Sequence, residues 1–334
     1  MVIPETFKAI RAEENSSGSI EPVLKEVTLD SMPVHEVLIR VEYSSLNYKD
    51  ALSATGNRGV TRNYPHTPGI DACGTVVYSA DQAFKKGDLV MVCGYDLGMN
   101  TPGGFGQYIQ VPAAWVMPLP EGLSMRESMM LGTAGFTAAL ALYKMEMNGQ
   151  KPGNGPVLVT GAGGGLGSLA INILSRSGYQ IIAATGKTSE QEYFKTIGAT
   201  QVIDREQVND QSGKLLLCQR WAGVIDTVGG NILSTAIRAC QTHGNVAVCG
   251  NAASFELPVN VYPFILNGVN LLGIDSATCP MELRKKVWNK LADDWRPDAL
   301  DIISHEISLD RLPEHIHLLL SGKIRGRVYV NLKD

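Results

Sequence analysis

Up to about residue 123, the chain alternates short runs of apolar and polar positions with glycine- or proline-rich turns. Apolar and polar residues mix at short period over 37–43, 74–78 and 89–92, and each run is bounded by a turn. These patterns predict short strands. Residues 125–143 are instead rich in Met, Ala and Leu and predict a helix or helix pair. We therefore expect a compact, partly closed β-domain followed by a helical lead into a second domain.

From residue 156 onward, apolar runs of strand length alternate with connections of helix or loop length. Six such runs occur, at 157–159, 180–184, 201–203, 223–226, 245–248 and 270–274. This alternation is typical of a doubly wound parallel sheet, in which nucleotides bind at the carboxyl ends of the strands. The predicted fold class is therefore α/β, with a β-domain beside a Rossmann-type sheet.

After the sixth strand, the pattern predicts helices over 281–292 and 312–320 and a final strand over 327–330. No further nucleotide-binding unit is available to receive that strand, so we expect it to return to the β-domain. The predicted domains are a discontinuous one, 1–123 with 297–334, and a nucleotide-binding one, 124–296.

The first strand of the predicted sheet leads into a glycine-rich turn, and an apolar-periodic segment follows. The turn comprises Gly161, Ala162, Gly163, Gly164, Gly165, Leu166 and Gly167. Residues without a Cβ let the chain bend sharply and let a pyrophosphate approach the backbone at the positive end of the next helix. Leu166 stands where G-x-G-x-x-G would place its third glycine, so the register differs from the simple motif. A flexible loop is the alternative, but the flanking strand and helix favour a dinucleotide site.

The end of the second strand indicates which dinucleotide is bound. NAD sites carry an Asp or Glu there, about 20 residues beyond the turn, to bind the ribose. This chain has Thr185, Gly186 and Lys187 instead, and Arg205 follows the third strand. Lys187 and the planar fork of Arg205 suit a 2′-phosphate, although either could be an ordinary solvated charge. The predicted cofactor is NADP(H).

Composition narrows the class of protein further. The chain has 334 residues, of which 44% are hydrophobic and 19% charged, with a net charge of −4. These values favour a globular protein with a large core, and nucleic acid or an anionic membrane surface is not an expected partner. No targeting segment and no window of about 18 apolar residues is visible, so we expect a cytoplasmic protein. The six cysteines form no C-x-x-C pair and are expected to be reduced and mostly buried.

Several segments resemble one known family. They are SSLNYKDAL (44–52), PGID (68–71), GTAGFTA (132–138), the glycine turn (161–167) and PFIL (263–266). Together they resemble the medium-chain dehydrogenase/reductase superfamily, and more narrowly its zinc-free quinone oxidoreductase branch, which includes NADPH-dependent acrylyl-CoA reductases. The resemblance covers almost the whole chain. It implies a GroES-like β-domain beside a Rossmann domain, an active site between them, and a homodimer, with pairing of the sixth strands as one possible contact.

Zinc enzymes of the superfamily need thiolate and imidazole ligands at defined positions, where this sequence has other residues. Asn47 occupies the position of the first ligand cysteine, and the Gly-His-Glu position reads Gly69-Ile70-Asp71. A tetrahedral zinc site needs such ligands, so we expect no metal. The remaining chemistry is hydride transfer from the cofactor to an electron-poor carbon, with the protein supplying position and polarity.

The resemblance implies a set of site residues. Asn47 and Tyr48 are the catalytic candidates, with Asp50 expected to orient its neighbours, and Tyr48 is also placed near the cofactor. The implied cofactor contacts further along the chain are Thr133, Asn251, Ile265, Ser276 and Arg327. Their alternatives are a plain helix N-cap for Thr133, core packing for Ile265 and a surface salt bridge for Arg327.

Substrate contacts are less clearly marked. Arg58 stands where some related enoyl reductases have a tyrosine, and with Arg62 it could bind an anionic CoA tail or be solvated. His66 is expected to be a packed or surface histidine rather than a proton donor. Three functions stay open: reduction of a small enoyl-CoA such as acrylyl-CoA, reduction of quinones, and non-catalytic NADPH binding.

Overall fold

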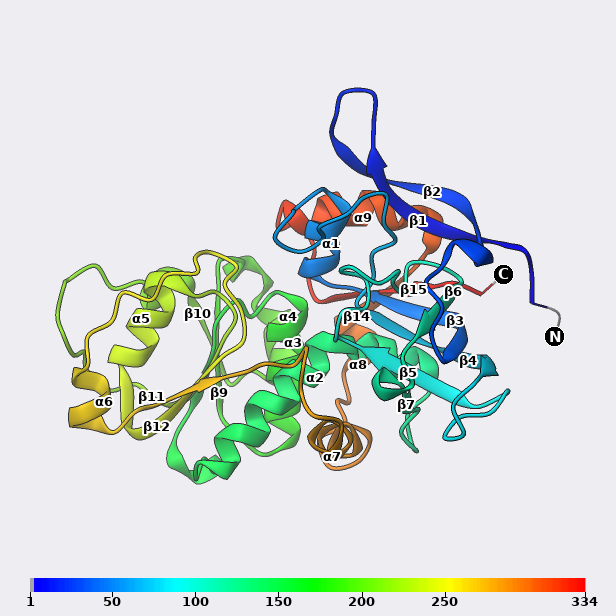
Figure 1. The fold of residues 1–334 in the computed structure, drawn as a ribbon. Helices are drawn as coiled ribbons and strands as arrows, with labels where there is room; N and C mark the ends of the chain where they lie inside the picture. Colours follow the sequence, from blue (N-terminus) through cyan, green and yellow to red (C-terminus); the bar gives the residue numbers. More distant parts are fainter. Residues whose placement is uncertain (1–2, 334) are drawn as a thin grey trace. The chain divides into compact units, whose positions relative to one another are not determined.

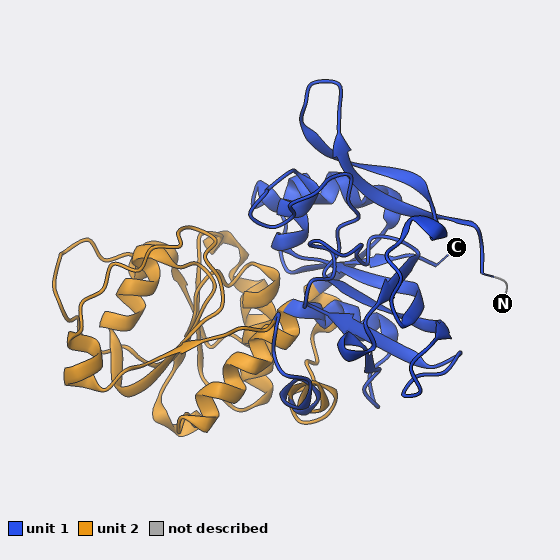
Figure 2. Ribbon diagram, in the orientation of Figure 1, with its two compact units in different colours: residues 1–133, 277–286, 304–334 blue, residues 134–276, 287–303 orange. Residues whose placement is uncertain are grey.

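The computed structural model describes residues 3–333, which form two compact units (Figure 2). Unit 1 runs up to Thr133 and also contains Ala277–Lys286 and the chain from Ser304 onward. Unit 2 comprises Ala134–Ser276 and Val287–Ile303. These divisions differ from the predicted boundaries after residues 123 and 296: unit 1 extends to residue 133 and resumes at residue 304, and the ten residues Ala277–Lys286 after the sixth strand also belong to it.

Unit 2 contains a six-stranded parallel sheet within the described chain. Its strands are β8 (Val157–Val159), β9 (Ile181–Thr185), β10 (Gln201–Asp204), β11 (Trp221–Asp226), β12 (Cys240–Val248) and β13 (Asn270–Gly273). Their order is β10-β9-β8-β11-β12-β13, and every neighbouring pair is parallel. The predicted doubly wound sheet is therefore confirmed, with β8 at the point where the order reverses.

Helices flank this sheet. They are α3 (Gly165–Arg176), α4 (Gln191–Thr196), α5 (Gly230–Arg238), α6 (Tyr262–Asn267) and α8 (Leu300–Ile303). Figure 1 shows α3 and α4 on one side of the strands and α5 and α6 on the other. All residues of β8, β9 and β11 are buried, because helices cover both faces, and this is why these strands read as continuous apolar runs. Two further helices, α2 (Met125–Met147) and α7 (Met281–Ala292), contain the unit boundaries at 133/134 and 286/287.

Unit 1 is built mainly of antiparallel strands. They are β1 (Thr6–Glu14), β2 (Ile20–Thr28), β3 (Val37–Leu46), β4 (Asp71–Ser79), β5 (Leu89–Cys93), β6 (Tyr108–Val111), β7 (Met117–Pro118), β14 (Ser304–Ser308) and β15 (Arg327–Asn331). β1 and β2 form a separate hairpin, and the main sheet has the order β14-β15-β3-β4-β5-β7, with β6 also paired to β3. Helices α1 (Tyr48–Ala54) and α9 (Leu312–Leu320) lie against each other.

The closing strand behaves as predicted. β15 pairs antiparallel with β3, so that Val328 lies opposite Leu46 and Val330 opposite Ser44. Alternate side chains of these strands enter a core that includes Val41, Val328 and Val330. This pairing returns the end of the chain to the β-domain, beside the start of α1. Among the helices of the described chain, none has the length and apolar content that a membrane crossing requires.

Candidate functional site

A buried carboxylate organises the start of α1. Asp71, the first residue of β4, is fully buried and accepts hydrogen bonds from the Ser45 hydroxyl (2.6 Å) and the Asn47 side-chain amide (2.8 Å). It also accepts bonds from the main-chain N–H (2.9 Å) and the hydroxyl (2.6 Å) of Thr133. An ionised carboxylate only accepts hydrogen bonds, so four donors from two separate segments, residues 45–47 and Thr133, are tied to one side chain.

Asp50 joins the same network from the first turn of α1. Its carboxylate accepts bonds from the main-chain N–H of Asn47 (2.8 Å) and of Ile70 (2.8 Å). Burial, followed by the nearby charge of Asp71, raises the pKa of Asp50 to about 7, and the hydrogen bonds from Asn47 and Ile70 oppose that rise. The prediction that Asp50 orients its neighbours agrees with this geometry, since it closes the first turn of the helix.

Arg327, at the start of β15, lies between these carboxylates and the main chain. It is 3% exposed and donates from Nη1 to the Leu46 carbonyl (3.0 Å) and to Asn47 Oδ1 (3.0 Å), and from Nε to the Met130 carbonyl (3.3 Å). Burial lowers its pKa, while the charges of Asp71 and Asp50 raise it. The alternative of a surface salt bridge is therefore wrong.

Asn47 has its side chain committed within the network. Its Nδ2 lies 2.8 Å from Asp71 Oδ2, 3.1 Å from Asp50 Oδ2 and 3.3 Å from the Ser45 carbonyl, and its Oδ1 accepts from Arg327. An amide nitrogen has two hydrogens, and both point at protein acceptors. Asn47 is thus placed to hold the start of α1 rather than to donate to a substrate.

Gly132 lets α2 pass close to this cluster. The helix is kinked there, with the glycine at φ +50°, a value in the left-handed region that favours glycine. A Cβ at this position would lie 2.4 Å from Ser45 Oγ and 2.6 Å from Asp71 Oδ2. The bend presents Thr133 to Asp71, so Thr133 is a ligand of a buried carboxylate and more than a plain N-cap. Sequence reasoning assigned no role to Ser45, Asp71 or Gly132, although all three stand in segments that carry the family resemblance.

The raised pKa of Asp50 gives a pH dependence with a definite sign. An unfolded Asp has a pKa of about 3.9, whereas burial raises the pKa of folded Asp50 to about 7. Because the folded state binds this proton more tightly, the contribution of Asp50 to the free energy of unfolding is present below about pH 4 and is lost as pH rises to about 7. Melting temperatures measured from pH 4 to 8 should therefore fall less steeply with pH in Asp50→Asn than in the wild type. Parallel curves would contradict the assignment.

The glycine turn forms the second candidate region, in unit 2. α3 begins at Gly165, after Gly164 at its N-cap. Gly161 has φ +59°, and a Cβ there would lie 2.2 Å from Thr227 Oγ1; a Cβ on Gly167 would lie 2.4 Å from the Gly161 carbonyl oxygen. Gly164 is exposed, and a Cβ on it would meet only one neighbouring atom, at 3.4 Å. The turn therefore leaves the N-terminus of a twelve-residue helix open, as anion binding requires.

Of the predicted phosphate-binding side chains, Lys187 lies beside this turn and Arg205 lies against Gly186. A Cβ on Gly163 would lie 3.7 Å from both Lys187 Cδ and Thr185 Oγ1. A Cβ on Gly186 would lie 3.3 Å from three atoms of the Arg205 guanidinium. The structure thus gathers the end of β9, the first residue after β10 and the turn after β8 at the carboxyl edge of one sheet.

The other predicted residues are distributed over several elements. Tyr48 is the first residue of α1 and is 48% exposed. Ser276 accepts a hydrogen bond from Thr137 (2.8 Å), and Asn251 is exposed after β12. Ile265 in α6 is 66% exposed, so the alternative of core packing is wrong.

The loop after α1 holds the predicted substrate arginines. Arg58 is exposed; it donates to the Arg62 carbonyl (2.5 Å) and its guanidinium lies 5.0 Å from the centre of the Tyr64 ring. Arg62 is exposed as well. His66 is 5% exposed and burial lowers its pKa to about 4, which agrees with a packed, neutral histidine.

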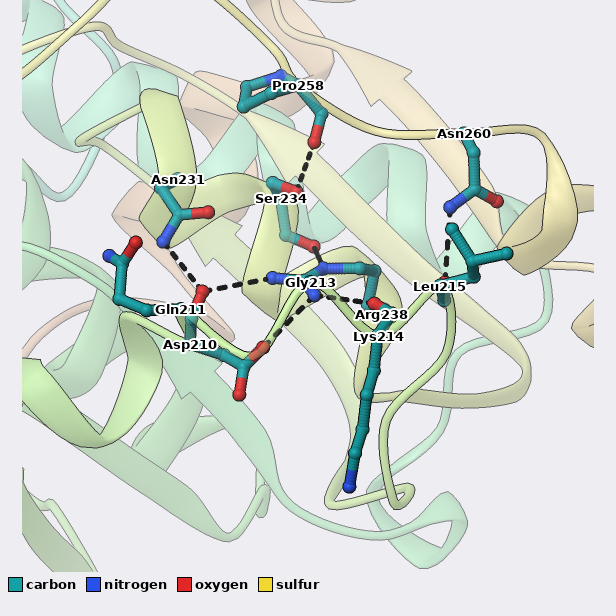
Figure 3. Close-up of a pocket in the computed structure, with 10 residues that line it drawn as sticks. All are labelled: Asp210, Gln211, Gly213, Lys214, Leu215, Asn231, Ser234, Arg238, Pro258 and Asn260. Atoms are coloured by element: carbon teal, nitrogen blue, oxygen red, sulfur yellow. Dashed lines mark hydrogen bonds and ion pairs between the residues drawn. The ribbon is translucent and has the colours of Figure 1, made fainter.

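Figure 3 shows a cavity elsewhere in unit 2, of about 260 Å³. Its lining residues are Asp210, Gln211, Gly213, Lys214, Leu215, Asn231, Ser234, Arg238, Pro258 and Asn260. The buried Arg238 donates to Asp210 Oδ1 (3.1 Å) and to the Lys214 carbonyl (2.7 Å). No residue that the sequence predicted for a site lines this cavity, and the bonds of Arg238 show that it organises the loop around it.

The residues present do not fit a zinc ion. Within residues 3–333 no group of three or more His, Cys, Asp or Glu side chains is placed to hold a metal. Asp71 is already bound by four donors. Burial raises the pKa of the Cys73 thiol to about 12 and that of Cys93 well above its usual value, which disfavours the thiolate forms that zinc binds.

Comparison with known families identifies both parts of the chain. Residues 33–121 match the alcohol dehydrogenase GroES-like domain, and residues 165–293 match the family described as zinc-binding dehydrogenase. The chain belongs to the medium-chain dehydrogenase/reductase family. The resemblance and the fold class predicted from the sequence are thereby confirmed. The protein is therefore an oxidoreductase of this family.

Individual relatives show which branch of the family the chain resembles most. YhfP of Bacillus subtilis, which carries a quinone oxidoreductase name, is 44% identical over 98% of this chain and 99% of its own length. The acrylyl-CoA reductase AcuI of Ruegeria pomeroyi is 42% identical over 96% of this chain and 97% of its own length. The chain therefore groups with the quinone oxidoreductases and acrylyl-CoA reductases of the family.

Two solved structures are similar over nearly the whole chain. YhfP crystallised with NAD has a TM-score of 0.95 at 44% identity and covers 98% of this chain and 100% of its own. The YhdH oxidoreductase of Salmonella enterica in complex with NADP has a TM-score of 0.95 at 37% identity, with the same coverage. Similar backbones thus accompany two different dinucleotides in these relatives.

The matched family is described as zinc-binding, whereas we predict that this protein needs no zinc. Activity should be unchanged after dialysis against a chelator, because the side chains at the expected ligand positions are the amide Asn47 and the fully bonded carboxylate Asp71. Reductase activity and bound metal should be measured on the same dialysed sample. A loss of activity that added zinc restores would contradict the prediction.

Proposed function

We propose that this protein is an NADPH-dependent reductase that transfers hydride to the activated C=C bond of a small enoyl-CoA such as acrylyl-CoA, giving propanoyl-CoA. The observation that carries the proposal is the open N-terminus of α3, where the Gly161–Gly167 turn lies beside Lys187, while Arg205 lies against the neighbouring Gly186. The 42% identity to an acrylyl-CoA reductase supports the enoyl-CoA substrate.

The chain has suitable groups for each part of the cofactor. Main-chain N–H groups of the turn and the start of α3 would hold the pyrophosphate, and Lys187 and Arg205 would hold the 2′-phosphate. When bound, NADPH supplies the hydride. The NADP complex of the related YhdH supports this choice, and the NAD complex of YhfP makes it a choice that must be tested.

On the substrate, hydride adds to the β-carbon, negative charge develops on the thioester oxygen, and a proton from solvent then adds to the α-carbon. A donor facing that oxygen lowers the barrier. We assign this role to the Tyr48 hydroxyl, which is half-exposed and bonds to no residue that the structure describes. Asn47 and Asp50 act as positioning residues, because their hydrogen bonds fix the turn of α1 that carries Tyr48.

A single assay compares the candidate functions. NADPH consumption is followed with acrylyl-CoA and, separately, with 1,4-benzoquinone as acceptor. We expect rapid turnover with acrylyl-CoA and a reduced kcat in Tyr48→Phe, which keeps the ring and removes the donor. Turnover with the quinone alone would support the second candidate, which the name of YhfP favours. Binding of NADPH without turnover of either acceptor would leave a cofactor-binding protein.

We also propose that the protein forms a homodimer through the edge of its parallel sheet. β13 is the last strand in the sheet order. Exposed apolar side chains occur within this strand and in the ten residues before it: Val261, Ile265, Leu266 and Leu271. An unpaired edge beside apolar surface is suited to pairing with a second copy. Leu266→Asp should shift the mass measured by light scattering from dimer to monomer. Val34→Asp, which alters an equally apolar side chain that is 88% exposed in unit 1, should not.

A further inference from the structure

Two loops at the carboxyl edge of the unit 2 sheet are joined by one buried side chain, Asp226, which has no role in the proposed function. Asp226, the last residue of β11, is fully buried. Its Oδ1 accepts a hydrogen bond from the Thr160 hydroxyl (2.6 Å), and its Oδ2 accepts from the main-chain N–H of Gly229 (2.8 Å) and of Val228 (3.3 Å). Thr160 directly precedes the glycine turn, so the carboxylate joins that turn to the loop after β11.

A second set of contacts transmits this arrangement to the turn itself. The main-chain N–H of Thr227 donates to Thr160 Oγ1 (3.1 Å), and the Thr227 hydroxyl donates to the Thr160 carbonyl (3.0 Å). The Thr227 hydroxyl also fills the space where a Cβ on Gly161 would stand, 2.2 Å away. The position of Gly161 is therefore set by the loop that Asp226 fixes.

The same loop supports the chain after β12. Ala252 and Ala253 donate main-chain hydrogen bonds to the carbonyls of Thr227 (3.3 Å) and Val228 (2.9 Å). Cys249 donates to the Asp226 carbonyl (2.8 Å). The Asp226 carboxylate thus joins the segments that follow β8 and β11, and the main-chain carbonyls of residues 226–228 bond the segment that follows β12.

The chemistry of these contacts requires a carboxylate. Both oxygens of Asp226 face donors, and an ionised carboxylate is the side chain that only accepts. An Asn at this position could keep the two main-chain bonds by turning its NH₂ group toward Thr160. The Thr160 hydroxyl would then accept from both that NH₂ group and the Thr227 N–H, and it would lose the acceptor of its own hydrogen. Burial raises the pKa of Asp226, and its three hydrogen bonds oppose that rise. A buried carboxylate is costly to maintain unless it is well bonded.

We infer that Asp226, acting through Thr160 and Thr227, is a positioning residue that holds the dinucleotide turn in the shape that binds a pyrophosphate. This inference rests on the proposed NADPH binding, but the geometry it describes exists without the cofactor. In this role Asp226 itself contacts neither cofactor nor substrate. Its removal should weaken dinucleotide binding and leave the chemical step intact.

The test compares a matched pair at Thr160, a buried residue. Thr160→Val keeps the volume and removes the hydroxyl, whereas Thr160→Ser keeps the hydroxyl. We expect the Kd for NADPH, measured by calorimetry, to rise about 10-fold in Thr160→Val and further in Asp226→Asn, and to stay within about twofold in Thr160→Ser. The kcat at saturating NADPH should be unchanged in all of them.

A control separates positioning from general destabilisation. Ser234 is also buried in unit 2 and donates a 2.6 Å hydrogen bond, to the Pro258 carbonyl, outside the turn. Ser234→Ala should lower the melting temperature without changing the Kd for NADPH. An equal rise of Kd in Ser234→Ala, or an unchanged Kd in both Thr160→Val and Asp226→Asn, would overturn the inference. If Thr160→Val fails to fold, Thr227→Val, at a partly exposed residue, tests the same link to Gly161.

A measurement without cofactor keeps this inference distinct from the proposed function. Hydrogen exchange of the apo protein should be faster at the amides of 161–164 in Thr160→Val than in the wild type, and unchanged in Thr160→Ser. If the wild type binds no NADPH, the proposed function fails, and the exchange experiment still decides whether Asp226 and Thr160 hold the turn. Equal exchange in the two Thr160 variants would refute the positioning role.

Discussion

Replacing Asp71 with Ala should lower kcat/KM by about 100-fold or more, the scale of loss that follows when reacting groups are misplaced by about an ångström. The substitution removes the acceptor that holds Ser45, Asn47 and Thr133. It also leaves the buried Arg327 with only the partial compensation of Asp50. Breaking such a buried charge arrangement costs about 3–5 kcal/mol of unfolding free energy. Steady-state kinetics and urea unfolding of the same preparation measure both effects.

Two adjacent serines provide the control for this result. Ser44 and Ser45 are both fully buried, and each donates a short hydrogen bond to Asp71. Ser45 bonds to the carboxylate, whereas Ser44 bonds to the main-chain carbonyl of the same residue. Ser45→Ala should therefore reduce kcat/KM more than Ser44→Ala at a similar loss of stability. Equal kinetic effects would mean that the carboxylate network has no special part in positioning α1.

The elements that could be predicted from the sequence are those defined by local patterns. The six parallel strands read as apolar runs because both faces of the sheet are covered. The helices over 281–292 and 312–320 have the bounds expected from their periodicity. The return of the last strand to the β-domain, where it pairs with β3, was predicted because no further nucleotide-binding unit was available to receive it. The discontinuous assignment of 277–286 to unit 1 has no local signal, because it depends on packing between distant segments.

The buried hydrogen-bond network around Asp71 could not be predicted from the sequence. Its members come from β3, β4, α2 and β15, so their meeting depends on the whole fold. An Arg is normally exposed, and nothing around Arg327 in the sequence indicates that it is buried against Asn47. The sequence also made Asn47 a candidate donor to substrate, whereas the structure shows its amide bonded to Asp71 and Asp50. The family resemblance singled out Asn47, Asp50 and Arg327 but not Ser45 or Asp71, and the contacts among these residues could be described only from the fold.

Lys187→Ala should weaken NADPH binding by about 10- to 100-fold and leave NADH binding nearly unchanged. A hydrogen bond to a charged group is worth about 1.5–3 kcal/mol, and each 1.4 kcal/mol is about a factor of ten in Kd. Only the phosphorylated cofactor would lose this contact. Both dissociation constants can be measured by the change in cofactor fluorescence on binding. Lys195→Ala is the matched control, because Lys195 is an exposed lysine of α4 that pairs with Glu192 (3.0 Å).

The same comparison distinguishes Lys187 from Arg205. The Arg205 guanidinium lies over Gly186 and has a 3.4 Å ion pair with Glu206, in which both side chains are largely exposed. Exposed ion pairs contribute little, so this pair does not hinder Arg205 from turning to a phosphate. Arg205→Ala should therefore also weaken NADPH more than NADH, and the double variant should bring the two affinities together. If both single variants weaken NADH and NADPH equally, the 2′-phosphate does not lie at the ends of β9 and β10, and the preference for NADPH has another origin.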